Sequence, residues 1–225
     1  MIYMADSANP SQVRELIDIF PIEGVTTNPT IVAREKCDYA DMLRTMRTVI
    51  GKDMMLHVQT MQTRAEDMVR EALALQEAVG GNFYIKIPAC AQGLKAIRML
   101  KREGVKVTAT AIFSTQQALL CARAGADFVA PYVNKLSDLC VDAVSVVGEI
   151  VREFKEFQLP TRVLSASFRN VSQVNQVALM GSHAITLPVP FYDKLIDHPM
   201  TTLALEGFQT DWQSVYGAQM PEDML

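Results

Sequence analysis

Short runs rich in β-forming residues alternate with longer amphipathic segments along the whole of this 225-residue chain. This alternation is typical of repeated βα units around a parallel sheet. Eight runs predict strands, at residues 2–6, 24–28, 54–60, 83–88, 106–112, 127–133, 162–168 and 184–189. Segments between them predict helices, most clearly at residues 63–79, 92–103, 115–124, 139–157 and 171–180.

The length fits either one α/β barrel or two small domains, and a composition of 49% hydrophobic residues can fill a core. Two observations favour the barrel. The sequence has no linker rich in Pro, Gly or Ser, and no G-x-G-x-x-G follows the first run. We therefore predict a single-domain (β/α)8 TIM barrel over residues 1–225, with residues 199–225 as a C-terminal helical tail.

Charge and hydropathy narrow the class of partner. A net charge of −4 and the lack of an arginine-rich stretch argue against nucleic acid. No segment stays apolar for the length of a membrane span, and the N-terminus has no basic region followed by a long apolar stretch. We interpret the chain as a cytoplasmic protein whose partner is a small molecule.

Cysteine and histidine spacing indicates no cofactor or metal site, although it does not exclude a metal. The four cysteines are far apart and predict buried, reduced thiols, and the three histidines are equally dispersed. These residues are Cys37, Cys90, Cys121, Cys140, His57, His183 and His198.

Lys86 lies in the middle of the apolar run at residues 83–88. An ammonium buried without a partner is costly, so the amine tends to lose its proton. A neutral lysine is a nucleophile that can form a Schiff base with a carbonyl. The alternative is a lysine that is salt-bridged, or that snorkels from an edge strand.

Polar residues also occur late in every predicted strand, where the active site of such a barrel lies. A cluster of this kind needs a ligand or a dense hydrogen-bond network to satisfy it. Its members are Asp6, Thr26, Asn28, Gln59, Lys86, Thr108, Thr110, Tyr132, Asn134, Ser165, Ser167 and Thr186.

Four of these segments resemble the signature segments of the transaldolase family, with the greatest likeness to its small fructose-6-phosphate aldolases. They are GVTTNP at 24–29, IKIP at 85–88, APYVN at 130–134 and ASFR at 166–169. The resemblance runs from residue 2 to about residue 212. It implies a (β/α)8 barrel, a Schiff-base lysine on the fourth strand, no metal, and donors related to dihydroxyacetone.

Carried over residue by residue, the resemblance makes Lys86 the Schiff-base lysine and Asp6 a group that hydrogen-bonds substrate hydroxyls. It makes Asn28 and Ser167 the groups that hold the donor end. Thr26 shares a strand face with Asn28 and is counted with the substrate-binding residues.

Two further positions separate the subfamilies. Where transaldolases carry glutamate and phenylalanine, this chain has Gln59 and Tyr132, which match the aldolases. A phenol with an ordered water, held by Gln59 and Thr110, would relay a proton. The resemblance thus implies reversible cleavage of fructose 6-phosphate to dihydroxyacetone and glyceraldehyde 3-phosphate. The alternatives are a transaldolase and a non-catalytic barrel that binds sugar phosphates.

The chain departs from the aldolase pattern at the expected phosphate end. Lys135 stands where the family usually has arginine, and Arg169 stands where the aldolases tend to have lysine. Arginine binds phosphate bidentately and lysine as a point charge. We predict that both bind the substrate phosphate; the alternative is a solvated role.

Several candidates have ordinary structural alternatives. Tyr132 could be a core tyrosine tied to a backbone carbonyl, and Asp6 could cap the following helix. Asn28 before proline could simply start a helix, and Gln59 and Thr110 could be ordinary satisfied polar groups. His57 is interpreted as structural.

Aromatic residues recur every four positions near the C-terminus, at Phe208, Trp212 and Tyr216. They predict a helix over residues 201–216 with an aromatic stripe. The stripe could pack on its own barrel. The resemblance instead implies a homo-oligomer, a pentamer or decamer, in which this tail contacts a neighbouring subunit.

Overall fold

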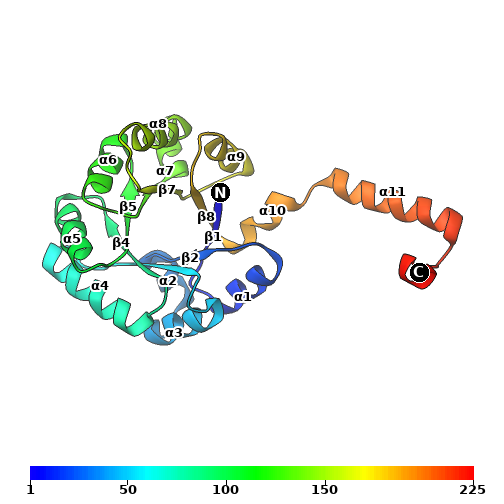
Figure 1. Cartoon of the computed structure of the whole chain (residues 1–225), viewed down its shortest axis with the longest axis horizontal. Coiled ribbons are helices and arrows are strands. Elements are labelled where there is room, and N and C mark those ends of the chain that lie inside the picture. The colour runs from blue at the N-terminus through cyan, green and yellow to red at the C-terminus, as the bar shows by residue number, and fades with distance from the viewer. The chain divides into compact units, whose positions relative to one another are not determined.

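The computed structural model describes all 225 residues and contains eight parallel strands that close into a barrel in the order of the sequence. Figure 1 shows the strands surrounded by helices. The strands are β1 (Ile2–Asp6), β2 (Gly24–Thr26), β3 (Met55–Gln59), β4 (Phe83–Pro88), β5 (Val107–Ile112), β6 (Phe128–Pro131), β7 (Arg162–Ser165) and β8 (Ala184–Leu187). The predicted (β/α)8 fold is confirmed.

Two strands, β1 and β4, have the predicted bounds, whereas β2, β6, β7 and β8 end two or three residues early. The reason at β2 and β6 is that the chain leaves the sheet to begin a helix. Asn28 is the N-cap of the helix after β2, and Tyr132 occupies the N-cap position after β6. A cap residue is extended, so its sequence is difficult to distinguish from a strand end.

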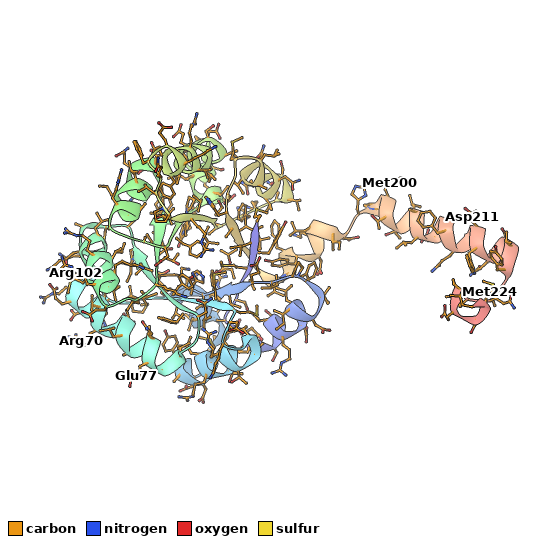
Figure 2. All side chains as sticks on the ribbon, in the orientation of Figure 1. Arg70, Glu77, Arg102, Met200, Asp211 and Met224 are labelled. Carbon is orange, nitrogen blue, oxygen red and sulfur yellow. The ribbon has the colours of Figure 1, made fainter.

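Helices follow the strands around the barrel. They are α1 (Pro10–Ile19), α2 (Pro29–Glu35), α3 (Tyr39–Ile50), α4 (Ala65–Val79), α5 (Ala91–Arg102), α6 (Thr115–Arg123), α7 (Val133–Asp138), α8 (Ala143–Glu156) and α9 (Val171–Leu179). The predicted helix at 139–157 begins late, at Ala143, because the Asp142 side chain accepts from the Ser145 N–H and caps it there. Charged residues such as Arg70, Glu77 and Arg102 point outward to solvent (Figure 2).

Side chains from six strands form a hydrophobic core inside the barrel. The core cluster consists of Met4, Met55, Tyr84, Phe128, Leu164 and Ala184. His57 is fully buried beside it, stacked on Tyr84 with 4.4 Å between ring centroids and hydrogen-bonded through Nδ1 to Thr108 Oγ1 at 2.8 Å. Burial, with Lys86 and Arg162 nearby, lowers the pKa of His57 well below 6.5, so the imidazole is a neutral part of the core.

The prediction of buried thiols is correct only for Cys121, because Cys37, Cys90 and Cys140 are exposed. All four are free. The three exposed cysteines lie outside the packed elements. Cys90 caps α5, Cys37 lies between α2 and α3, and Cys140 follows α7.

The chain divides into two compact units, Met1–Val189 and Pro190–Leu225. The second unit contains α10 (Asp193–Ile196) and the long α11 (Pro199–Tyr216), which begins two residues before the predicted helix because His198 caps it. In α11 the rings of Trp212 and Tyr216 lie 4.5 Å apart, and the helix has no buried residue. Met200 and Asp211 mark this helix in Figure 2. No helix is both long and apolar enough to span a membrane.

Candidate active site

Lys86 is 6% exposed on β4, between Gln59 of β3 and Thr108 of β5 in the strand register. Its Nζ donates to the backbone carbonyl of Thr27 at 2.8 Å. None of the ion pairs in the structure involves Lys86. The amine is therefore neither salt-bridged nor exposed, and both alternatives from the sequence are wrong.

Lys86 and Asp6 influence each other's protonation. Burial lowers the pKa of Lys86, and the nearby Asp6 carboxylate opposes that shift. Burial likewise raises the pKa of Asp6, opposed by the Lys86 ammonium and by a hydrogen bond from Thr26. Because burial is the largest cause for both groups, the site favours an uncharged amine more than water does.

Asp6 ends β1 and is held by a neighbouring strand. Thr26 Oγ1 donates to Asp6 Oδ1 at 2.7 Å. Thr26 Oγ1 also lies 2.7 Å from Thr186 Oγ1. The alternative in which Asp6 caps the next helix is wrong, because Asn9 caps α1 by accepting from the N–H groups of Ser11 and Gln12. The Asp6 side chain therefore remains inside the site.

Asn28 does start a helix, as its structural alternative stated. Its Oδ1 accepts from the Ile31 N–H at 3.1 Å, and Pro29 occupies the first helical position. This bond uses the side-chain oxygen only. The Nδ2 donors are left for another partner.

Tyr132 meets Thr110 at a distortion of the sheet. The register between β5 and β6 shifts between Ala109 and Ile112, and Ala111 there has a φ of 56°. Tyr132 Oη lies 2.9 Å from Thr110 Oγ1. Burial is the main cause that raises the pKa of Tyr132, so its hydroxyl keeps a proton that it can donate. Its side-chain partner is the Thr110 hydroxyl, and its backbone hydrogen bond, at Ala111, lowers the pKa as an N–H donor does. Neither partner is the backbone carbonyl of the core alternative.

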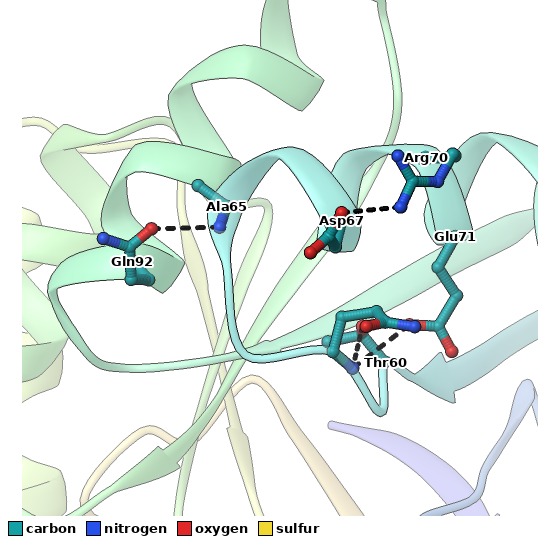
Figure 3. Close-up of polar contacts among 7 residues, drawn as sticks. Thr60, Ala65, Asp67, Arg70, Glu71 and Gln92 are labelled. Atoms are coloured by element: carbon teal, nitrogen blue, oxygen red, sulfur yellow. Dashed lines mark hydrogen bonds and ion pairs between the residues drawn. The ribbon is translucent and has the colours of Figure 1, made fainter.

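Gln59 ends β3 with a buried Oε1 that has no hydrogen-bond partner, so it is not an ordinary satisfied amide. The loop that follows is firmly held. Thr60 N donates to the Lys86 carbonyl at 3.1 Å, and the Glu71 carboxylate accepts from the Met61 N–H. Figure 3 shows Glu71 beside Thr60, whose hydroxyl also donates to this carboxylate. These contacts hold the backbone that directly follows Gln59 and tie it to Lys86.

Of the predicted phosphate-binding residues, Lys135 lies in α7 after β6 and Arg169 lies in the loop after β7. A hydrogen bond from Asn134 N to Ser167 O at 2.7 Å joins these two segments. Lys135 Nζ lies 5.4 Å from the centroid of the Tyr132 ring. Arg169 is exposed, and only its backbone N–H forms a hydrogen bond, to Gln173. The structure thus places Lys135 beside Tyr132 and leaves the Arg169 guanidinium free.

Thr27 is the residue of the site that sequence reasoning missed. Its carbonyl accepts from Lys86, and its own buried hydroxyl has no partner. A backbone acceptor leaves no trace in residue identity, so only the position of Thr27 inside GVTTNP could have pointed to it.

Residues 3–224 match the family described as transaldolase/fructose-6-phosphate aldolase. The chain belongs to this family. It is also 35% identical over 213 residues to a probable fructose-6-phosphate aldolase of Streptococcus pneumoniae, covering 94% of this chain and 96% of that protein. The resemblance drawn from the four motifs is confirmed, and the protein is an enzyme of the aldolase and transaldolase type.

Solved structures with similar folds are distant in sequence. Thiamine phosphate pyrophosphorylase from Pyrococcus furiosus has a TM-score of 0.59 at 15% identity, with 96% of each chain covered. A mutant flavocytochrome b2 with pyruvate bound has a TM-score of 0.61 at 11% identity, and the match covers 91% of this chain but only 61% of that chain. These likenesses support the barrel fold alone.

Proposed function

We propose that this member of the family is a class I aldolase that reversibly cleaves fructose 6-phosphate to dihydroxyacetone and glyceraldehyde 3-phosphate without a metal or other cofactor. The observation that carries the proposal is Lys86, a buried amine with a lowered pKa and no ion-pair partner, placed on β4 between Gln59 and Thr108. A lysine in this state is an activated nucleophile for a ketone.

In the proposed reaction, neutral Lys86 Nζ attacks the C2 carbonyl of the sugar, and the carbonyl oxygen leaves as water. The resulting iminium withdraws electrons from the neighbouring carbons. The C4 hydroxyl then loses its proton, the C3–C4 bond breaks, and its electron pair forms an enamine. Glyceraldehyde 3-phosphate leaves as the aldehyde.

Tyr132 is the proposed proton carrier in both halves of this cycle. The C4 proton passes to an ordered water held by Gln59 and Thr110. The Tyr132 hydroxyl gives its own proton to the enamine carbon and is reprotonated by that water. The hydrogen bond between the Thr110 and Tyr132 hydroxyls and the unpaired Gln59 Oε1 support this arrangement. Water then hydrolyses the iminium, which releases dihydroxyacetone and free Lys86.

The remaining site residues are proposed to hold the donor. Asp6 accepts from a substrate hydroxyl through the carboxylate oxygen that Thr26 does not use. Asn28 donates through Nδ2, because its Oδ1 caps α2. Ser167, in the left-handed region with a φ of 62°, presents its hydroxyl from the loop after β7. A non-glycine residue in that region is a feature that recurs at functional sites.

A transaldolase is the rival function that the family leaves open. It would keep the enamine intact until an acceptor aldehyde arrives, whereas an aldolase protonates it. The test incubates the wild-type protein with fructose 6-phosphate alone and then with erythrose 4-phosphate. Free dihydroxyacetone without an acceptor supports the aldolase; product only with erythrose 4-phosphate identifies a transaldolase. A non-catalytic barrel gives no product in either incubation and no adduct with borohydride.

Removing the charge of Lys135 or Arg169 is expected to weaken binding of glyceraldehyde 3-phosphate. Charge-assisted hydrogen bonds contribute about 1.5–3 kcal/mol, so KM should rise roughly 10- to 150-fold in Lys135→Gln and Arg169→Gln. The synthetic reaction with unphosphorylated glyceraldehyde should hardly change. Lys135→Arg should retain or strengthen binding.

The matched control for these two variants is Lys52→Gln, which removes one exposed cation before β3, at the opposite end of the barrel. It should leave both reactions unchanged. Equal losses with both aldehydes in the Lys135 and Arg169 variants would assign these residues to the fold instead of the phosphate.

We also propose that α11 serves assembly into a homo-oligomer, a pentamer or decamer. The helix exposes apolar side chains that water solvates poorly, including Phe208 at 67% and Val215 at 71%. Removal of residues 199–225 should therefore yield a smaller species by light scattering. Phe208→Ser should weaken the assembly in the same direction without removing the helix. An unchanged mass for both variants would refute this role.

A further inference from the structure

Three side chains on neighbouring strands form a hydrogen-bonded chain that ends on Asp6. Thr186 Oγ1 of β8 lies 2.7 Å from Thr26 Oγ1 of β2, which lies 2.7 Å from Asp6 Oδ1 of β1. Both threonines are buried, with exposures of 4% and 0%. Strand β1 lies between β8 and β2, so the chain crosses the inner side of β1.

The direction of the protons in this chain follows from what each group can donate. An ionised carboxylate only accepts, so Thr26 must give its single hydroxyl proton to Asp6. The Thr26 oxygen is then free to accept from Thr186. Thr186 is therefore the donor at the far end, and its donation polarises the Thr26 hydroxyl toward Asp6.

The need for such a chain arises from the reaction cycle proposed above. Asp6 is desolvated, which favours its protonated form, and the Lys86 ammonium opposes that effect. Lys86 must be uncharged when it attacks the ketone and again when it is part of the enamine. At those stages Asp6 loses its main cationic neighbour, while the threonine chain stays in place.

We propose that Thr186 is a positioning residue that acts through Thr26 to keep Asp6 ionised and fixed in orientation while Lys86 is uncharged. This inference rests on the proposed function for its role in the cycle. Its effect on Asp6 itself exists in the resting protein. The titratable groups that face Asp6 are Lys86 on β4 and Tyr132 after β6.

The test is a titration of the Asp6 carboxyl by ¹³C NMR in the full-length protein, with the resonance assigned by its loss in Asp6→Asn. Thr186→Val has nearly the same shape but no donor, so the Asp6 midpoint should move upward by about half a pH unit. Thr186→Ser keeps the donor and should restore the wild-type midpoint. An unchanged midpoint in Thr186→Val would overturn the proposal.

The matched control is Ser165→Ala on β7. It removes a buried hydroxyl that is hydrogen-bonded to Ser182 and makes no hydrogen bond to Thr186, Thr26 or Asp6. Its Asp6 midpoint should stay at the wild-type value. If Thr186→Val does not fold, Thr186→Ala removes the same donor with a smaller side chain. A wild-type Asp6 midpoint in Thr186→Ala would also overturn the proposal.

Activity provides a second readout. The value of kcat/KM for fructose 6-phosphate at a fixed pH should fall in Thr186→Val and recover in Thr186→Ser, and an unchanged value in Thr186→Val would contradict a role in the cycle. Failure of the proposed function can be distinguished from failure of this inference, because the wild-type protein would then form no borohydride adduct. The Asp6 titration would still decide whether Thr186 controls that carboxyl.

Discussion

Lys86→Met should lose about 10⁴-fold or more of the cleavage activity, because methionine fills the same volume without a nucleophile. In the wild type, borohydride with dihydroxyacetone should add mass to the peptide that contains Lys86. The variant should gain none. The matched control is Lys106→Met, which removes a lysine that precedes β5 and bonds the Asn82 side chain at 2.8 Å. Labelling elsewhere, or an active Lys86→Met, would refute the mechanism.

The pH dependence of adduct formation tests the state of the amine in the same experiment. Only the neutral amine attacks, so the trapping rate rises with pH until Lys86 is fully deprotonated. Because burial lowers the pKa of Lys86, the half-maximal rate should lie below 10.5, the ordinary lysine value. A half-maximal rate at or above that value would mean that the site does not activate the lysine.

Tyr132→Phe should lower kcat by about 10²–10⁴-fold with little change in KM, because it removes the proposed proton carrier without removing a proposed substrate contact. The ring should stay in place, since it packs edge-on against Phe113 with 5.5 Å between centroids. Thr110→Val, which removes one partner of the phenol, should cause a smaller loss in the same direction. A normal kcat for Tyr132→Phe would make Tyr132 a packing residue.

Exchange of both subfamily markers extends this prediction from rate to reaction type. Gln59→Glu combined with Tyr132→Phe should raise the ratio of transfer to cleavage when erythrose 4-phosphate is present. The reason is that the enamine then lacks its nearby proton source and survives until the acceptor arrives. If the ratio does not change, these two positions do not decide between aldolase and transaldolase.

The sequence was sufficient to predict the barrel, because the signal is periodic and repeated. Each apolar run indicates a strand and each amphipathic segment indicates a helix. Because this pattern repeats, an error at one boundary does not alter the topology. The ends of β2 and β6 show where this fails, since Asn28 and Tyr132 are extended residues that already belong to the next helix. The exposed Cys37, Cys90 and Cys140 show that residue type alone does not fix burial in loops.

The sequence by itself determined which residues form the site and at which end of the barrel the site lies. Lys86 in an apolar strand, with polar residues at the strand ends, was enough to place a buried amine at one end of the barrel. The tertiary structure alone decided which groups these side chains form hydrogen bonds with. Thr26 and Thr186 are 160 positions apart and meet only because β8 closes onto β1. The carbonyl of Thr27 and the bulge at Ala111 are properties of the backbone path, which the side chains at those positions do not encode.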